Sequence, residues 1–476
     1  MGRNGYNGAG SGLQESPICC DFFPQFPSLN MEQKSLSCLL ALLLGLVGDT
    51  SLAADEPIII AEKFEPGHAY QVDVQVKLRG KLAIASEKGK PPRIVPIDGA
   101  SRLNYDERIL APDEARSQKA VRAYREVEFK RVVGNNTQDA GIRPSVRRMV
   151  VIRSGERRAP FSPDGPLTWG EIDVVRTDVF NPAAIPGLLP KRPVKVGQSW
   201  KATAGAVAEL TDMQKVDEGE LTVELAGTTT LVGKPAAKLK IAGVIRGINE
   251  DGPNRQTLEG TAYYYLESGI VAYLSIKGTH EMLDGEGRTV GSIEGQFIMT
   301  RQPIKSLPPD LSDASLRGLN LKPDVENTQL LYDDGNLGVR FLYPRGWRVG
   351  AVQGKQLTLD HAGLGGGMLI TVEPPAKVPS AESYLKEATA FLQKEKAKVA
   401  VLLAPTRVRP EPGQLDRFSL EAVFEKETAR LEYAVLKQSD GGATVAARLP
   451  ASSNELRTDA ERIMRSLFIT KPIADK

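Results

Sequence analysis

Hydrophobic and polar residues alternate along several stretches of the first half of the chain. Over residues 72–79, three valines and a leucine alternate with Asp, Gln, Lys and Arg. The same period of two recurs over residues 126–130 and 221–225. This period is typical of a strand with one face in the core and the other in solvent.

Turn residues separate these stretches. Glu267-Ser268-Gly269 divides residues 262–279 into a predicted hairpin, and a second turn at 284–287 leads into a strand over 291–300. We therefore predict a β-rich domain at 55–304, a meander that forms a large curved antiparallel sheet or an open half-barrel. An irregular, proline-punctuated stretch over 160–193 is expected to cross one face of it.

A proline-rich linker is predicted at 305–327, with a short helical turn near 312–319. The second domain, residues 328–470, mixes strands with two helices. One helix is predicted to start at Ser380, and the last is predicted to open with a capping box of Ser452 and Glu455. Strands are expected near 339–343, 356–360, 368–372, 417–424, 430–437 and 443–449.

The second domain resembles the PsbP-like fold. The resemblance is carried by Gly-Val-Arg-Phe-Leu-Tyr-Pro-Arg-Gly-Trp at 338–347, by Thr-Val-Ala-Ala-Arg-Leu-Pro at 444–450 and by Arg-Ser-Leu-Phe at 465–468. It implies an α/β/α sandwich that is mostly a binding or assembly module without catalytic residues. The fold class expected for the whole chain is therefore α+β, a mainly antiparallel β domain followed by this sandwich.

The first domain is similar to uncharacterised exported bacterial proteins that carry a Leu-Pro-x-x-Pro-Val-x-Val-Gly-x-x-Trp signature, here residues 189–200. Pro193 and Gly197 are expected to shape a turn, after which Trp200 anchors a strand in the core. The signature marks a fold and identifies no function.

The N-terminal region has the layout of an export signal. Residues 1–30 are expected to be disordered or a wrongly assigned extension, and residues 31–54 are predicted to be a signal peptide with an apolar run over 36–47. The run is short for a membrane span, which needs about 20 apolar residues. We expect a periplasmic or extracellular protein, and an uncleaved membrane anchor is the alternative.

Composition limits the chemistry of the mature chain. Cys19, Cys20 and Cys38 all precede the predicted cleavage site, so we expect no disulfide and no cysteine nucleophile. The full chain carries a formal net charge of +2, which does not favour nucleic acid as a partner. Neither a cofactor nor a metal site is expected.

One cluster of charge is a candidate site for an anionic partner, because guanidinium groups bind phosphate and carboxylate at two points. The six arginines surround a predicted hairpin at 154–155; they are Arg143, Arg147, Arg148, Arg153, Arg157 and Arg158. The alternative is a solvated hairpin whose arginines pair with nearby acids.

Catalytic patterns are sparse. The three histidines, His68, His280 and His361, show no metal-binding spacing. The glycine-rich segment 363–367 lies between two predicted strands, so a hairpin connection is favoured over a phosphate-binding loop. The acids Glu171, Glu259 and Glu267, each near aromatic residues, are the only groupings that suggest glycoside hydrolysis.

The sequence therefore favours a non-enzymatic envelope protein that binds a lipid, an envelope polymer or a protein partner. A curved half-barrel that shelters a lipid, as in LolA-like carriers, is a comparison at the level of fold alone. A hydrolase acting on cell-wall or polysaccharide material and a purely structural protein without a small ligand are the alternatives.

Overall fold

The computed structural model describes residues 56–84, 92–112, 118–154, 157–249, 252–410, 413–425 and 427–473. They all belong to one compact unit, residues 48–476. The predicted N-terminal extension and signal peptide lie outside the described residues. Among the described residues, no helix combines the length and the apolar character that a membrane crossing requires.

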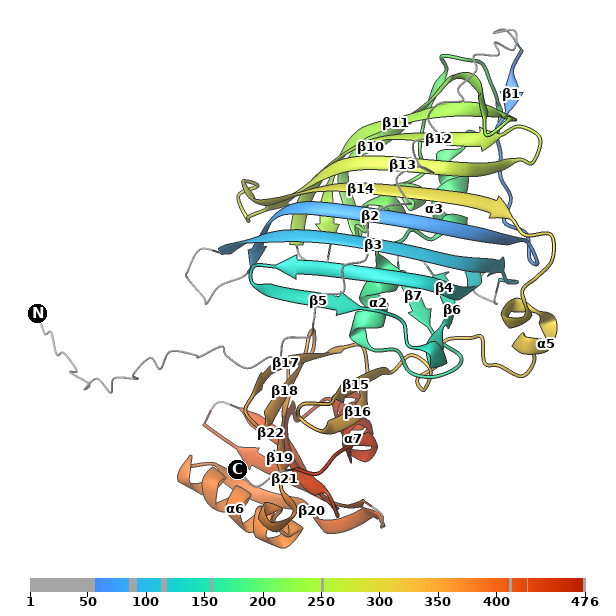
Figure 1. The fold of residues 1–476 in the computed structure, drawn as a ribbon. Coiled ribbons are helices and arrows are strands. Elements are labelled where there is room, and N and C mark those ends of the chain that lie inside the picture. The colour runs from blue at the N-terminus through green and yellow to red at the C-terminus, as the bar shows by residue number, and fades with distance from the viewer. Residues whose placement is uncertain are drawn as a thin grey trace, which may run out of the picture. The chain divides into compact units, whose positions relative to one another are not determined.

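The first half of the described chain forms one twelve-stranded sheet in which every neighbouring pair is antiparallel (Figure 1). Its order is β7-β6-β4-β3-β2-β14-β13-β12-β11-β10-β9, and β5 pairs with β4. The strands are β2 (Ala69–Ile84), β3 (Arg93–Ile109), β4 (Gln118–Val133), β5 (Asn136–Ala140), β6 (Arg148–Ser154), β7 (Arg157–Phe161), β9 (Ser199–Lys201), β10 (Lys215–Leu231), β11 (Lys234–Asn249), β12 (Gly252–Tyr265), β13 (Ile270–Leu283) and β14 (Thr289–Pro303).

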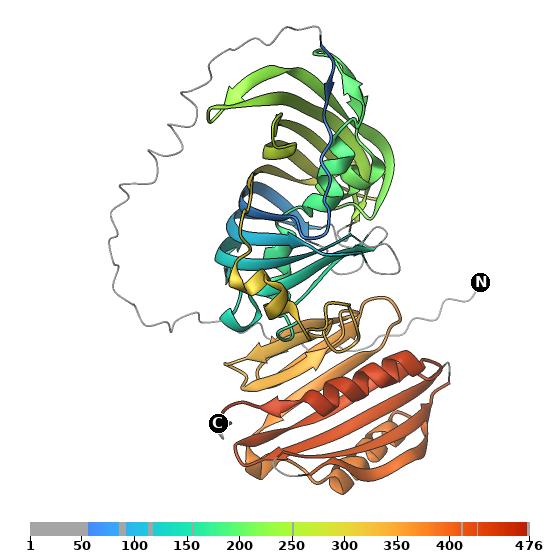
Figure 2. The ribbon, with the colours of Figure 1, turned by 90° about the vertical axis from the view of Figure 1, so that its right-hand side faces the viewer.

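The predicted large antiparallel sheet is confirmed, and it is open. Strands β10 to β14 follow one another as a meander, and β14 then pairs with β2, the first strand of the sheet in the sequence. The alternation over residues 72–78 places Val72 and Val74, both fully buried, on the face that we call the inner face. Figure 2 shows the curvature of the strands.

Glycines on the inner face permit this curvature. A Cβ atom at Gly80 would lie 2.1 Å from the carbonyl oxygen of Ser292, and one at Gly243 would lie 2.1 Å from that of Glu220. No side chain fits at such a distance, so only glycine lets the neighbouring backbones approach this closely.

Three short helices cover part of the inner face: α2 (Trp169–Arg176), α3 (Asn181–Leu188) and α4 (Ala204–Thr211). Their apolar residues share one core with the strands, for example Val175, Ile185 and Val207 with Leu103 and Leu239. The stretch 160–193 was predicted to be irregular, and this is wrong for the two helices α2 and α3.

Pro186 does not prevent α3 from forming, because the carbonyl group that it leaves without a helical donor finds another donor. Pro186 has no N–H to bond to the carbonyl of Pro182, four residues earlier. That carbonyl instead accepts a hydrogen bond from Nε2 of Gln118 in β4 at 2.7 Å.

The signature segment 189–200 joins α3 to the sheet. A two-stranded sheet forms between β1 (Ile58–Ile59) and β8 (Pro193–Val194). The chain turns at Gly197, whose φ is +84°. Trp200 then packs against the main core and donates from Nε1 to the carbonyl of Leu188 at 2.8 Å, as an anchoring residue should.

The C-terminal part contains two further sheets. A three-stranded sheet has the order β15-β16-β24, and a seven-stranded sheet has the order β17-β18-β19-β23-β22-β21-β20. Their strands are β15 (Leu330–Asp334), β16 (Val339–Tyr343), β24 (Phe468–Ile469), β17 (Trp347–Gln353), β18 (Gln356–His361), β19 (Gly367–Glu373), β20 (Lys398–Arg409), β21 (Gln414–Val423), β22 (Thr428–Gln438) and β23 (Gly441–Pro450).

Helices cover both faces of the seven-stranded sheet. In β22, Val435 packs in a cluster with α6 (Ala381–Lys394), whereas Ala434 belongs to the core that contains Ile463 of α7 (Asn454–Ser466). Because consecutive strand residues point to opposite faces, α6 and α7 lie on opposite sides of the sheet.

Helix boundaries largely follow the capping residues. Ser380 caps α6, as predicted, and α5 (Asp313–Leu316) occupies the expected helical turn. The predicted capping box of the last helix is wrong by one residue. The cap of α7 is Ser453, whose side chain accepts from the N–H of Leu456, so Glu455 stands in the first turn without closing a box. Three 3-10 turns complete the elements, at Pro144–Val146, Pro309–Leu311 and Pro375–Lys377.

Candidate functional site

Arg143, the first arginine of the predicted cluster, is held by Glu171. Its Nε lies 2.8 Å from Oε1 and its Nη2 lies 2.8 Å from Oε2. Glu171 also closes the capping box of α2 by accepting from the N–H of Thr168 at 2.8 Å. Burial acts to raise the pKa of Glu171, but the hydrogen bonds from Arg143 and Thr168 lower it overall. The carboxylate therefore remains charged and neutralises the guanidinium.

Strands β6 and β7, on either side of the expected hairpin at 154–155, pair with each other, and three arginines of the cluster bind acids of this chain. Nε of Arg148 donates to Asp164 at 2.8 Å. Arg153 and Arg158 both pair with Glu209 of α4.

Two arginines of the cluster differ from these. Arg147 donates to the backbone carbonyl of Arg125 at 3.2 Å. The side chain of Arg157 lies outside the described residues. The described arginines of the cluster thus have acceptors supplied by this chain. Arg153 and Arg158 share Glu209, whereas Arg143, Arg147 and Arg148 bind elsewhere, so the cluster as a whole does not converge on one point.

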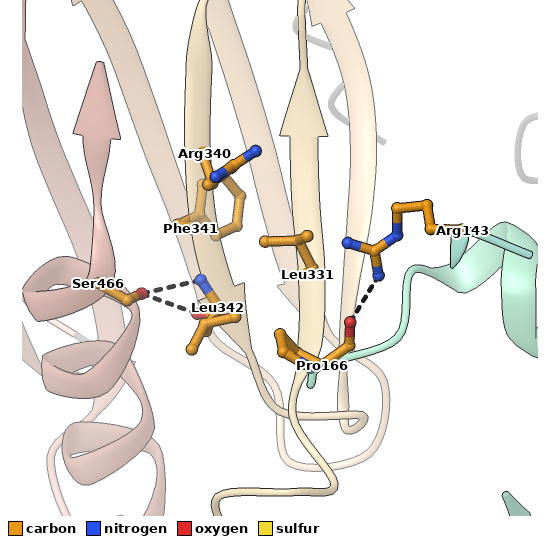
Figure 3. Close-up of a pocket in the computed structure, with 7 residues that line it drawn as sticks. All are labelled: Arg143, Pro166, Leu331, Arg340, Phe341, Leu342 and Ser466. Atoms are coloured by element: carbon orange, nitrogen blue, oxygen red, sulfur yellow. Dashed lines mark hydrogen bonds between the residues drawn. The ribbon is translucent and has the colours of Figure 1, made fainter. Parts of the chain in front are cut away.

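Arg143 also lines a cavity of about 390 Å³ (Figure 3). Leu331, Phe341 and Leu342 supply apolar walls, and Arg340 lies on the same strand as Phe341. Arg340 pairs with Asp333, so both arginines of this cavity are already neutralised. The remaining lining residues are Pro166, whose carbonyl accepts from Arg143, and Ser466, which bonds to the backbone of Leu342.

A larger cavity, of about 590 Å³, lies between the segment 61–66, the ends of β3 and β4, and α3. We call it the α3 cavity. Most of its lining is apolar. The apolar lining residues are Ala61, Phe64, Pro66, Ile109, Leu110, Pro112, Pro182 and Pro186. Its size is within the range of cavities that hold small ligands, roughly 300–1,000 Å³.

The charged residues of the α3 cavity are three lysines, Lys63, Lys119 and Lys191, and one acid, Glu62. Glu62 is buried and committed elsewhere, because its Oε1 lies 2.9 Å from Nη2 of Arg301 and its Oε2 accepts from the N–H of Val271 at 2.8 Å. The lining therefore presents net positive charge next to apolar walls.

Lys191 has an unusual backbone. Its φ of 54° lies in the left-handed region, which is unfavourable for a residue with a Cβ. Its N–H is bonded to the carbonyl of Ile60 at 3.3 Å. Strained residues of this kind concentrate at functional sites, and this one lines the cavity.

A fully buried charge network lies on the inner face near the same strand ends. Arg122 donates from Nε to Glu107 and from Nη1 to Asp178, both at 2.9 Å. Tyr105 bonds to the same carboxylate of Asp178. Burial raises the pKa of Asp178 despite the attraction of Arg122. Among the described residues, Oε1 of Glu107 has no hydrogen-bond partner.

The acids that suggested hydrolysis lie on different elements. Glu171 is bound to Arg143. Glu259 lies on β12 directly opposite Lys277 and is exposed, and Glu267 lies in the exposed turn after β12. None of the three lines either of these two cavities.

The histidines take local roles. His68 lies near the carbonyl of Lys63, and Nδ1 of His361 accepts from the N–H groups of Gly363 and Leu364. The segment 363–367 connects β18 to β19 as a hairpin, as predicted. Among the described residues, no group of three or more His, Cys, Asp or Glu side chains is arranged to hold a metal ion.

Sequence reasoning missed the α3 cavity, because its lysines lie far apart in the chain. One local indication was available. Lys119 and Arg122 interrupt an otherwise apolar run in β4, and charges at buried strand positions are uncommon unless they are paired.

Comparisons with known proteins give only distant structural similarities. No protein-family model matches the chain, and no curated protein matches it. Cyanobacterial PsbP from Synechocystis is similar with a TM-score of 0.26 and 11% identity, over 30% of this chain and 92% of that chain.

Two other solved structures are also distantly similar to this chain. A structure titled for lipid–protein interactions in lipovitellin has a TM-score of 0.30 and 12% identity, over 56% of this chain and 28% of that chain. OccK5 (OpdH) of Pseudomonas aeruginosa has a TM-score of 0.13 and 8% identity, over 81% of this chain and 98% of that chain. Likenesses at this level carry no argument about function.

Proposed function

We propose that this protein is an exported, non-enzymatic binding protein that holds an anionic amphiphile in the α3 cavity. Such a ligand has a carboxylate or phosphate head and a hydrocarbon chain. The carrying observation is the combination of an apolar lining with two exposed lysines, Lys63 and Lys191, while the single glutamate of the lining is bound to Arg301. The C-terminal sheets, as a PsbP-like α/β/α domain, would serve as a docking module.

The lysines supply the head-group contacts in this proposal. Ammonium groups bind phosphate or carboxylate as point charges, and Lys63 and Lys191 are exposed at the rim of the cavity. Lys119 is buried, with 8% of its surface exposed.

The apolar walls supply the chain contacts. Each methylene group removed from water contributes about 0.8 kcal/mol, so the walls favour a hydrocarbon chain over a polar polymer. Phe64, Leu110 and Pro186 are half-buried in the structure, which leaves apolar surface for a ligand to cover.

The first experiment is mass spectrometry of whatever copurifies with the native exported protein, followed by titration with a fluorescent fatty acid. We expect an acyl-chain anion to copurify. The variant with Lys63→Ser and Lys191→Ser should bind the probe about tenfold more weakly, since each exposed charge contact contributes about 1 kcal/mol or less. Ala61→Trp should block binding by filling the cavity.

The control variant replaces two exposed lysines of the large sheet, with Lys240→Ser and Lys277→Ser, and should bind normally. A copurifying phospholipid and a free fatty acid are distinguished by their masses. Absence of any bound small molecule, together with equal probe binding by all variants, would refute the proposal and favour a purely structural protein.

A further inference from the structure

An apolar edge is exposed on the seven-stranded sheet. Strand β20 is the last of that sheet, so one of its sides has no neighbouring strand among the described residues. Three consecutive large apolar residues stand exposed on it, Val401 at 54%, Leu402 at 45% and Leu403 at 38%. Phe391, at 64%, is the most exposed aromatic side chain of the adjoining helix α6. We call these four residues the β20 edge.

These residues belong to one region of the molecule. Helix α6 packs against β20, and the two elements are joined by the short turn 395–397 (Figure 1). Phe391 lies within the last turn of α6, and Val401 follows the start of β20 by three residues. The chain therefore brings both to the same end of the sheet.

Basic residues predominate in the segment that carries this apolar surface. Over residues 388–410 there are five basic residues and a single acid, Glu395. Lys394, Lys396 and Lys398 are all exposed. Of the remaining two, Arg407 pairs with Asp416 of the neighbouring strand, and Arg409 bonds to backbone carbonyls. The three lysines are thus grouped at the junction of α6 and β20.

Apolar side chains flanked by lysines match the chemistry of an anionic bilayer surface. We infer that the β20 edge docks this protein on an anionic lipid surface, with Phe391 and Leu402 inserted and the three lysines at the head groups. The inference rests on residues that the α3 cavity does not use, so it stands or falls separately from the proposed ligand.

An added peptide strand is the other occupant that an edge strand suggests, and the backbone of β20 opposes it. The pairing with β21 shifts register at three places, between Val401 and Leu403, between Leu403 and Thr406, and between Arg407 and Arg409. Pro405 lies in the same stretch. Bulges and proline interrupt the regular hydrogen-bonding edge that strand addition requires, but they leave the apolar side chains exposed.

The test is flotation of the full chain with vesicles of phosphatidylglycerol and phosphatidylethanolamine, compared with phosphatidylcholine vesicles. We expect binding to the anionic vesicles that weakens as salt is added. The variant Lys394→Gln with Lys398→Gln should lose about fivefold in partitioning per lysine. Phe391→Ser with Leu402→Ser should lose about tenfold or more.

The control is Val232→Ser with Val244→Ser, because these valines are 60% and 49% exposed, in the β10–β11 turn and on β11 of the large sheet. All four side chains replaced by serine are exposed, so each variant should keep the thermal midpoint of the wild type. Equal flotation of all variants would overturn the inference. A second result would also overturn it: the variant Phe391→Ser with Leu402→Ser loses self-association in sedimentation velocity but binds vesicles as the wild type does. That result would identify a second copy of the chain as the occupant.

Discussion

Nη1 of Arg122 lies 2.9 Å from Oδ2 of Asp178, and neither side chain is exposed to solvent. The same guanidinium contacts Glu107, and its carbon lies 4.4 Å from the centre of the Tyr105 ring. A buried cation with two acidic partners links β3 and β4 to the segment between α2 and α3. The position of α3, and with it one wall of the α3 cavity, therefore depends on this network.

Replacing Arg122 should destabilise the protein strongly. Arg122→Met removes the cation that both Glu107 and Asp178 contact, and breaking a buried ion pair in this way typically costs about 3–5 kcal/mol. We expect a fall of this size in the free energy of unfolding by urea. Adding Glu107→Gln and Asp178→Asn to the same variant should recover part of the loss. The control is Arg255→Met, which breaks a surface pair with Glu281. If Arg122→Met lowered the free energy of unfolding no more than this control does, the buried network would not be a main source of stability.

The Arg143–Glu171 pair should make stability depend on acid pH. The pKa of Glu171 is lowered in the folded protein from its ordinary value of 4.5, so the unfolded chain binds its proton first as the pH falls. The stabilisation is therefore complete above the ordinary value and is lost as the pH falls through the lowered one.

Glu171→Gln tests this pH dependence. The variant should unfold at lower urea concentration than the wild type at pH 7, and the gap should narrow as the pH falls below about 4.5. Urea titrations at several pH values give the measurement. A gap that stays constant from pH 7 to pH 3 would show that the charge of Glu171 is not the source of the stabilisation.

Two glycines of the inner face form a matched pair. An added Cβ at Gly80 would lie 2.1 Å from the backbone oxygen of Ser292, whereas at Gly295 its nearest neighbour would be the oxygen of Lys77 at 3.8 Å. Gly80→Ala should therefore cost about 2 kcal/mol or more through forced backbone shifts, and Gly295→Ala should cost clearly less. Thermal unfolding of both variants measures the two losses of stability. Equal losses would contradict the explanation that backbone contact at Gly80 excludes a Cβ atom.

Lys191 should lower the stability of the folded protein through its backbone conformation and favour binding through its amine. Because its φ is 54°, Lys191→Gly should be more stable than Lys191→Ala by about 1 kcal/mol. Both variants should bind the anionic fatty-acid probe more weakly than the wild type, since both lack the amine. If both were as stable as each other, the left-handed conformation of residue 191 would not be strained in solution.

Local patterns predicted much of the fold. The alternation over 72–79 and the turn at 267–269 correspond to β2 and to the β12–β13 hairpin. Strand β20 was missed because Val401, Leu402 and Leu403 are apolar at consecutive positions, which obscures the period of two. Helix α3 was missed because prolines at 182 and 186 conceal a helix whose freed carbonyl is satisfied by Gln118. Helix α2, which contains no proline, was missed as part of the same proline-punctuated stretch.

The candidate site was much less predictable. The arginine cluster was visible because its members are close in sequence, yet their acceptors, such as Glu209, are not. The lysines of the α3 cavity come from three separate segments and form no motif.

The amino-acid sequence by itself determined the strands with a clear period of two, the turns between them and the cap of α6 at Ser380, because these depend on neighbours within a few positions. Only the tertiary structure decided that β14 pairs with β2 and that Glu62 meets Arg301 across 239 residues of chain. Such pairings depend on which apolar faces pack together over the whole sheet, and no local pattern records that choice. The α3 cavity and its charge follow from it.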